Sequence, residues 1–172
     1  MMIIHTSRFT LRPYRKSDLE SLVRHINDKT IARNTLSIPY PYTIKDAREW
    51  YRKTRNVARQ KKRDRYDFGI EIDGEIVGGI GIFKISGHKA EIGYWLSRQH
   101  WGKGIMTGAV KELTKYGFDQ LRLRRLYACV FPHNKASMRV LKKAGYKFEG
   151  ILRKNVKKGD KFVDEHLFAK VR

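Results

Sequence analysis

Gln99-His100-Trp101-Gly102-Lys103-Gly104 is the stretch that decides how this sequence of 172 residues is interpreted. It connects an expected strand, Ala90 to Leu96, to an expected helix. Its two glycines let the backbone approach a ligand closely because they have no Cβ atom. The amides from Gly102 to Thr107 would then converge at a helix N-terminus, where unpaired N–H groups and the helix dipole favour a phosphate or pyrophosphate. A purely structural turn is the alternative.

Two other phosphate-binding motifs share features with this loop, but neither fits. A Walker A loop requires G-x-x-x-x-G-K-[ST], which the sequence does not contain. A dinucleotide-binding fold requires G-x-G-x-x-G within parallel βαβ units. Here the third glycine, Gly108, lies one place late, and the strands before the loop have a hairpin pattern.

Alternating apolar residues before the loop predict an antiparallel meander. Phe68 to Ile72 and Glu75 to Phe83 flank Asp73-Gly74, a dipeptide typical of tight hairpins because both central turn residues need positive φ. With Ala90 to Leu96, these segments make three successive strands.

The N-terminal part predicts a strand and two helices. Phe9 to Arg12 is the strand, and the S-x-x-E pattern from Ser17 to Glu20 indicates a helix start. Thr43 is expected to cap the second helix. Ile38 to Tyr42 lies between the helices and cannot be helical, because each proline favours extended geometry in the residue before it. The apolar faces are Leu19, Leu22, Val23 and Ile26 in the first helix and Ile44, Ala47, Trp50, Tyr51, Thr54 and Val57 in the second.

Four further elements are expected after the loop. A helix carries apolar residues at helical spacing, a buried strand runs from Leu126 to Phe131, and Asn134 can cap another helix that ends before Gly145. Val163 to Val171 is the last expected strand. The helix after the loop has Ala109, Leu113, Tyr116, Gly117 and Leu121 on one face.

Charge is the most unusual property of the composition. Lysine and arginine outnumber aspartate and glutamate by 38 to 17, so the formal net charge is +21. Such an excess attracts phosphates, whether in nucleic acid, a ribosome or a phosphorylated cofactor. The run from Arg52 to Arg65 holds one acid, Asp64, and is either a solvated helix face or a docking patch. A second basic cluster spans Arg153 to Lys161.

Several classes are disfavoured by composition. The length predicts a single domain over residues 1–172. We expect neither a membrane span nor a secretion signal, since no stretch has the required apolar run. The lone Cys129 fits a reducing cytoplasm and cannot form an internal disulfide. The six histidines lack H-x-x-H and H-x-x-x-H spacing, so no metal site is expected.

Motifs along most of the chain resemble the GNAT acyltransferase superfamily. Gln99-x-x-Gly102-x-Gly104 is similar to its Q/R-x-x-G-x-G/A acetyl-CoA signature. Gly108 is a departure, since many relatives carry Glu there, and it puts local helix stability in doubt. The segments similar to the branch that contains the RimJ/RimL ribosomal-protein N-terminal acetyltransferases are Leu11-Arg12-Pro13, Pro41-Tyr42-Thr43, Ala90 to Leu96, His133 to Ser137 and Gly145-Tyr146-x-x-Glu149-Gly150.

The resemblance implies a fold and a cosubstrate. The fold is mixed α/β, with a central, mostly antiparallel sheet whose two central parallel strands are splayed and flanked by helices. Acetyl-CoA would lie between Glu91 to Leu96 and Leu126 to Phe131, with pantetheine pairing to the free strand edge. Asn134 would bond the pantetheine arm, cap a helix, or do both. The implied pyrophosphate ligands are Gln99, Gly102, Lys103 and Gly104 and the amides of Ile105, Met106 and Thr107.

Acetyl transfer needs a neutral amine, and an α-amine (pKa about 7.7 to 8.0) needs less help than a lysine (about 10.4). Glu91 is the candidate base, directly or through water, unless it is an ordinary surface residue. A backbone N–H among Tyr94, Trp95 and Leu96 is expected to stabilise the thioester oxygen. Ser137 would hydrogen-bond or protonate the leaving thiolate, or is a small packing residue. Cys129 is expected to be buried packing, which favours direct transfer in a ternary complex.

Three functions follow from these patterns. The first is an N-acetyltransferase that acts on a protein N-terminus or another primary amine. The second shares acetyl-CoA but acetylates a small-molecule amine. The third is a basic nucleic-acid or ribosome-binding module, favoured by the charge and by the Arg52 to Arg65 run but lacking an RNA-recognition motif. Ribosome association of the enzyme and a homodimer stay open.

Overall fold

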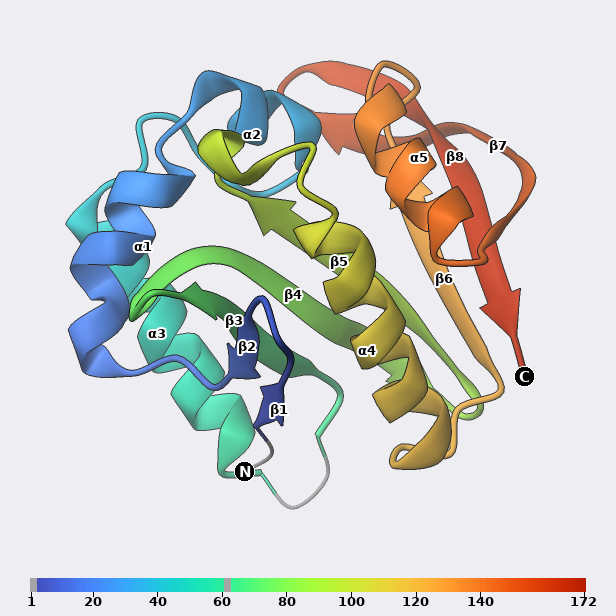
Figure 1. Cartoon of the computed structure of the whole chain (residues 1–172). Helices are drawn as coiled ribbons and strands as arrows, with labels where there is room; N and C mark the ends of the chain where they lie inside the picture. Colours follow the sequence, from blue (N-terminus) through green and yellow to red (C-terminus); the bar gives the residue numbers. More distant parts are fainter. Residues whose placement is uncertain (1–2, 61–62) are drawn as a thin grey trace.

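The computed structural model describes residues 3–60 and 63–172, and within them the chain forms one eight-stranded sheet flanked by helices (Figure 1). The strand order is β1-β2-β3-β4-β5-β6-β8-β7. The strands are β1 Ile4–His5, β2 Thr10–Arg12, β3 Tyr66–Ile72, β4 Glu75–Ser86, β5 Lys89–Leu96, β6 Arg125–Val130, β7 Lys147–Lys158 and β8 Lys161–Val171. The α-helices are α1 Leu19–Ile26, α2 Lys29–Asn34, α3 Ile44–Ala58, α4 Ile105–Asp119 and α5 Lys135–Lys143.

The predicted fold class is confirmed. Neighbouring strands pair antiparallel except β5 and β6, which are parallel. In the meander β3-β4-β5, the turn between β3 and β4 is formed by Asp73 and Gly74. Their φ angles of 49° and 81° match the predicted tight hairpin.

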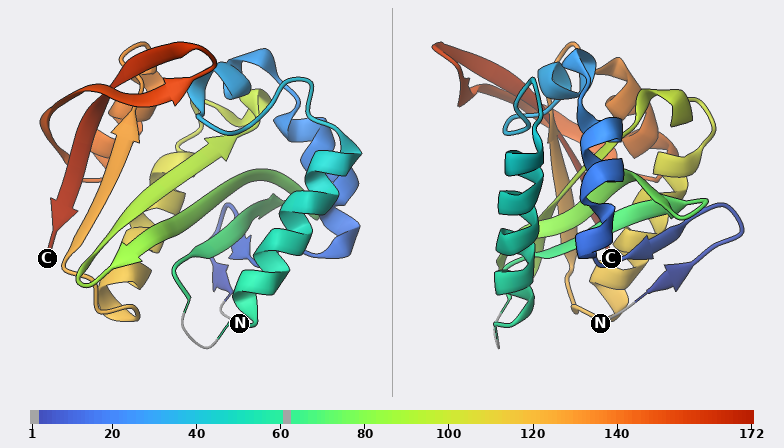
Figure 2. Two further views of the ribbon diagram at one scale, coloured as in Figure 1. Left: turned by 180° about the vertical axis from the view of Figure 1, so that it is seen from behind. Right: turned by 90° about the vertical axis from the view of Figure 1, so that its left-hand side faces the viewer.

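The parallel pair is splayed. β5 and β6 are in register only from Lys89–Arg125 to Glu91–Tyr127, and the remainder of β5 has no strand partner on that side. The left panel of Figure 2 shows the two strands starting side by side and diverging. The sheet therefore has an opening at its centre, at the carboxyl ends of these two strands.

Each face of the sheet has its own core. Ile92 and Leu96 of β5 pack with α4 and α5 in the larger cluster. Trp95, which points the other way, packs against a second cluster made by α1, α2 and α3 with Tyr14 and Ile76. The right panel of Figure 2 shows α3 and α4 on opposite sides of the sheet. Every helix in the described residues is too short or too polar to cross a bilayer.

Two of the three predicted side-chain caps of helices are confirmed. Thr43 and Asp46 form a reciprocal capping box at α3, and the Asn134 side chain accepts the Ser137 amide at the start of α5. The start at Ser17 is wrong, because Lys16–Asp18 form a 3-10 turn and α1 begins at Leu19. There the Asp18 carboxylate, not Ser17, accepts a backbone amide, that of Arg15.

Three elements were not predicted: β1, α2 and β7. In α2, the Asp28 side chain caps the helix by accepting the amides of Thr30 and Ile31. β7 includes most of the second basic cluster, and Arg153, Lys154, Lys157 and Lys158 therefore belong to an edge strand. Lys61 and Lys62 of the first cluster lie outside the described residues.

A buried ion pair joins β2 to the start of α1. Asp18 accepts two hydrogen bonds of 2.8 Å from the Arg12 guanidinium, and the two side chains are 5% and 3% exposed. Arg12 also contacts Glu71 of β3. The pair therefore connects the N-terminal strand to both the sheet and the helix.

We predict that Asp18→Ala lowers the free energy of unfolding by about 3 kcal/mol, because it leaves a buried guanidinium with one partner fewer. Urea unfolding with linear extrapolation measures it. Asp119→Ala is the control, since its pair with Arg172 is exposed and should contribute less than about 1 kcal/mol. Equal losses in the two variants would contradict this assignment.

Candidate active site

A cavity of about 1500 Å³ passes through the opening between β5 and β6. It is lined on one side by the N-terminus of α4 and by α5, and on the other by residues of α1, α2, α3 and the Ile38–Tyr42 loop. Its volume exceeds the roughly 300–1,000 Å³ of a typical ligand pocket. Two ligands can therefore meet here from opposite faces of the sheet.

The glycine loop ends at a helix N-terminus, as predicted. Gly102 and Gly104 have φ angles of 75° and 74°, a region that side chains disfavour. Gly104 is the N-cap of α4 and supplies no capping side chain. Since the first N–H groups of a helix have no acceptor within it, the amides of Ile105, Met106 and Thr107 are available to a ligand.

Arg8 lies at the same place, although sequence patterns did not mark it. Its guanidinium donates a 3.0 Å hydrogen bond to the Lys103 carbonyl and lines the cavity. A Cβ atom at Gly104 would lie 3.3 Å from Arg8 Nη1. Arg8 belongs to the N-terminal segment, 95 residues away in sequence, so only the folded chain reveals this extra positive charge beside the helix dipole.

Gly108, the departure from the family pattern, does not interrupt α4. A Cβ atom there would lie 3.1 Å from the ring of Phe9. The glycine therefore lets the N-terminal segment, including Phe9 and neighbouring Arg8, pack closely against the first turn of α4.

Most of the predicted site residues line the cavity, and two do not. The Gln99 side chain instead lies 3.1 Å from His25 Nδ1, and Lys103 contributes its carbonyl to Arg8. Contact of Gln99 and Lys103 with a ligand stays a prediction. The predicted residues that line the cavity are Glu91, Tyr94, Trp95, Leu96, Gly102, Gly104, Ile105, Met106, Thr107, Asn134 and Ser137.

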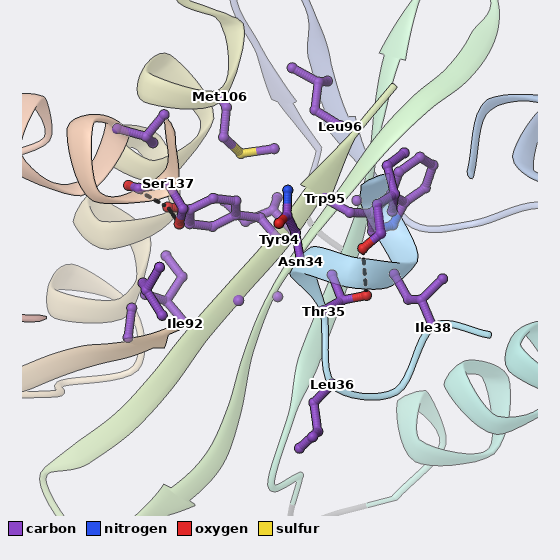
Figure 3. Close-up of a pocket in the computed structure, with 18 of the residues that line it drawn as sticks. Asn34, Thr35, Leu36, Ile38, Ile92, Tyr94, Trp95, Leu96, Met106 and Ser137 are labelled. Carbon is purple, nitrogen blue, oxygen red and sulfur yellow. Dashed lines mark hydrogen bonds between the residues drawn. The ribbon is translucent and has the colours of Figure 1, made fainter. Parts of the chain in front are cut away.

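Tyr94 and Ser137 meet across the opening. The Tyr94 hydroxyl lies 2.9 Å from Ser137 Oγ, and Figure 3 shows the tyrosine reaching from β5 to α5. Met106 of α4 lines the same part of the cavity. Burial raises the pKa of Tyr94, and the Ser137 hydrogen bond opposes it only in part. Tyr94 therefore remains a phenol and holds the Ser137 hydroxyl in place.

Glu91 lies on the other face, where its carboxylate accepts a 2.7 Å hydrogen bond from Lys84 Nζ. The hydrogen bond and the charge of Glu91 raise the pKa of Lys84. Glu91 is thus an ion-paired carboxylate at the rim of the splay, and its role as a base stays a prediction.

Cys129 lines the same face but is a poor nucleophile. Burial, together with the charges of Glu91 and Glu165, raises the pKa of its thiol to about 12. The thiolate is the reactive form of cysteine, so Cys129 is unreactive near neutral pH. Within the described residues no group of three or more His, Cys, Asp and Glu side chains could hold a metal ion.

The splayed strands, the amides at α4 and the through-sheet cavity define an acyl-CoA-dependent N-acyltransferase. A family model described as an acetyltransferase (GNAT) domain matches residues 8–147, and the chain belongs to this family. Acetyl-CoA is the family's cosubstrate.

Known proteins similar to this chain include two enzymes and a solved complex. YjcK of Bacillus subtilis (strain 168), named a probable N-acetyltransferase, is 42% identical over 74% of this chain and 72% of its own. Spermidine N(1)-acetyltransferase of Escherichia coli (strain K12) is 30% identical over 83% and 74%. The structure of Mycobacterium smegmatis RimJ in complex with CoA-disulfide matches with a TM-score of 0.84 and 27% identity, covering 95% of this chain and 81% of RimJ. Such neighbours confirm the predicted resemblance to the RimJ/RimL branch.

We predict that Arg8→Ala weakens acetyl-CoA binding about tenfold, which corresponds to about 1.4 kcal/mol, because the diphosphate loses a nearby cation. Isothermal titration calorimetry measures the dissociation constant. Arg48→Ala is the control, because Arg48 is an exposed arginine of α3 that does not line the cavity. An unchanged dissociation constant in Arg8→Ala would remove Arg8 from the cofactor site.

Proposed function

We propose that this enzyme transfers the acetyl group of acetyl-CoA to the α-amine of a protein N-terminus by direct attack in a ternary complex. The observation that carries the proposal is the cavity through the splayed sheet, which would allow a cosubstrate and an acceptor to meet from opposite faces. The unreactive thiol of Cys129 supports direct transfer, since it offers no acyl-enzyme route.

The residues around the opening fit acetyl-CoA. The amides of Ile105 to Thr107, with Arg8 beside them, suit the diphosphate, and the unpaired edge from Ile92 to Leu96 suits the pantetheine amides. Acetyl-CoA supplies an activated acetyl group as its thioester. A backbone N–H within Tyr94 to Leu96 is the proposed donor to the thioester oxygen.

Ser137 is the proposed hydrogen-bond donor to the departing sulfur. Asn134 accepts its backbone amide at 3.1 Å, and Tyr94 lies against its hydroxyl. Because burial keeps the Tyr94 phenol protonated, Tyr94 can hold the Ser137 hydroxyl in position to donate a hydrogen bond to the sulfur. Glu91 remains the proposed base, acting directly or through water while Lys84 compensates its charge.

An N-terminal acceptor is favoured over a polyamine by two considerations. An α-amine has a much lower intrinsic pKa than an alkylamine, so a larger fraction is already neutral. The net charge of +21 also repels a polycation over long distances. A small polyamine is the alternative acceptor, because one relative is named spermidine N(1)-acetyltransferase.

We predict that an acceptor panel distinguishes these classes. Tetrapeptides with free N-terminal serine or alanine should be acetylated with a kcat/KM at least tenfold above those of spermidine and a lysine peptide with a blocked N-terminus. Release of free coenzyme A thiol measures the rate. A preference for spermidine would overturn the N-terminal assignment, and no transfer to any amine would overturn the proposed function.

A row of arginines on α3 supports a further role in binding RNA on a ribosome. Arg48, Arg52, Arg55 and Arg59 are exposed and recur at helical spacing along one face. No ion pair to any of them is found in the described part of the chain. Adjacent like charges destabilise a helix, so a polyanion would relieve their repulsion.

We predict that the chain binds ribosomal RNA at 50 mM salt and that binding weakens at least tenfold by 200 mM salt. Replacing Arg52 and Arg55 with glutamine should reduce the slope of this salt dependence, because fewer counterions are released. Fluorescence anisotropy measures it, with Lys142 and Lys143 replaced as the control. A slope identical to that of the wild type would exclude the α3 row as the RNA-binding surface.

A further inference from the structure

Five carboxylates line the cavity: Asp46, Glu49, Asp67, Glu91 and Glu165. Three are already satisfied by neighbours of their own, since Asp46 bonds Thr43, Asp67 takes two hydrogen bonds from Arg65, and Glu91 is paired with Lys84. Glu49 lies on the exposed surface of α3. Glu165 differs from all of them in being buried.

Glu165 is 7% exposed, and its side-chain hydrogen-bond partner is a neutral amide. Asn155 Nδ2 donates a 2.8 Å hydrogen bond to Glu165 Oε2. Among residues 3–60 and 63–172, no lysine, arginine or histidine forms an ion pair with it. The second oxygen, Oε1, accepts no hydrogen bond from the described residues and is not fully buried, and Glu165 lines the cavity.

The strand register places Glu165 on the acceptor side of the sheet. Glu165 and Leu167 lie two residues apart on β8 and therefore share a face. Leu167 is opposite Cys129 of β6, and both line the cavity. Glu91 and Glu165 both line this cavity with Cys129, and the charges of both raise the pKa of its thiol.

Burying a carboxylate without a cation costs free energy, because the loss of hydration is normally offset by an ion pair. Primary amines are cations near neutral pH until a proton is lost. An arriving acceptor would therefore supply the missing charge at a position next to the opening.

We propose that Glu165 is the ammonium-binding group of the acceptor site and that Asn155 is its positioning residue. The inference rests on the proposed acetylation of an amine and adds the group that selects an amine from a neutral analogue. In this arrangement an acceptor N–H donates to Oε1 while Asn155 keeps Oε2 fixed. Glu91, already paired with Lys84, is a separate group, because it lies on β5 and β6 stands between β5 and β8.

Glu165→Gln tests the proposal, since it removes the charge and keeps the shape of the side chain. The acceptor is whichever panel member the wild-type enzyme acetylates fastest. We expect the acceptor KM to rise at least tenfold, whereas the dissociation constant of acetyl-CoA stays within twofold of wild type. Glu49→Gln is the matched control, because it neutralises an exposed carboxylate of the same cavity and should change the acceptor KM less than twofold.

A second readout separates charge recognition from a structural role. Acetylation removes one positive charge from the acceptor, so the wild-type enzyme should bind the amine at least tenfold more tightly than its N-acetylated product. In Glu165→Gln the two dissociation constants should lie within twofold of each other. A structural defect would weaken both ligands and leave their ratio unchanged, which would overturn the proposal.

Asn155→Ala keeps the test decisive should Glu165→Gln fail to fold, because Asn155 is an exposed residue of β7. It should raise the acceptor KM at least threefold without changing acetyl-CoA binding. A wild-type acceptor KM in Glu165→Gln, or in Asn155→Ala where that variant alone folds, would overturn the assignment. Failure of the wild-type enzyme to acetylate any panel amine would instead refute the proposed function.

Discussion

The early end of pairing between β5 and β6 is the constraint on which the rest of this structure depends. Three residue pairs join the strands, and beyond Glu91 and Tyr127 they separate. A continuous sheet would satisfy the backbone of Ile92 to Leu96 within the protein. Because the strands diverge, that edge is left for a ligand, and a cavity connects the two faces of the sheet. The helices on the two faces of the sheet then form the walls of this cavity.

The two faces provide different electrostatic environments. On the face covered by α4, the helix dipole, free amides and Arg8 favour a diphosphate. On the other face, Glu91 is paired with Lys84, whereas the buried Glu165 has no ion pair within the described residues. The proposed acceptor site therefore holds one uncompensated carboxylate in a protein whose net charge is +21.

Local signals predicted much of the fold because they act over a few residues. The Asp73-Gly74 turn, the Thr43 cap and the Asn134 cap depend on neighbours close in sequence. The predicted helix start at Ser17 was wrong because the Asp18 carboxylate is held by Arg12 of β2, a contact between separate elements. β7 was not predicted, because an exposed edge strand can consist largely of lysine and arginine. Its composition therefore indicated only a charge cluster.

The glycine loop and Ser137 belong to short motifs that resemble segments of the GNAT family, so the sequence was enough to predict them. Arg8 and Glu165 reach the cavity through long-range pairing of strands and helices, and no local pattern marks them. Tyr94 was expected only for its backbone, since its side-chain contact with Ser137 spans 43 residues. Residues of the acceptor side come from many elements, which is why the sequence identified a cosubstrate more readily than an acceptor.

The most direct test is a crystal structure of this enzyme with coenzyme A. The account predicts the diphosphate within hydrogen-bond distance of the amides of Ile105 to Thr107 and the pantetheine arm alongside Ile92 to Leu96. A diphosphate bound elsewhere, or pantetheine lying away from the open edge of β5, would contradict it.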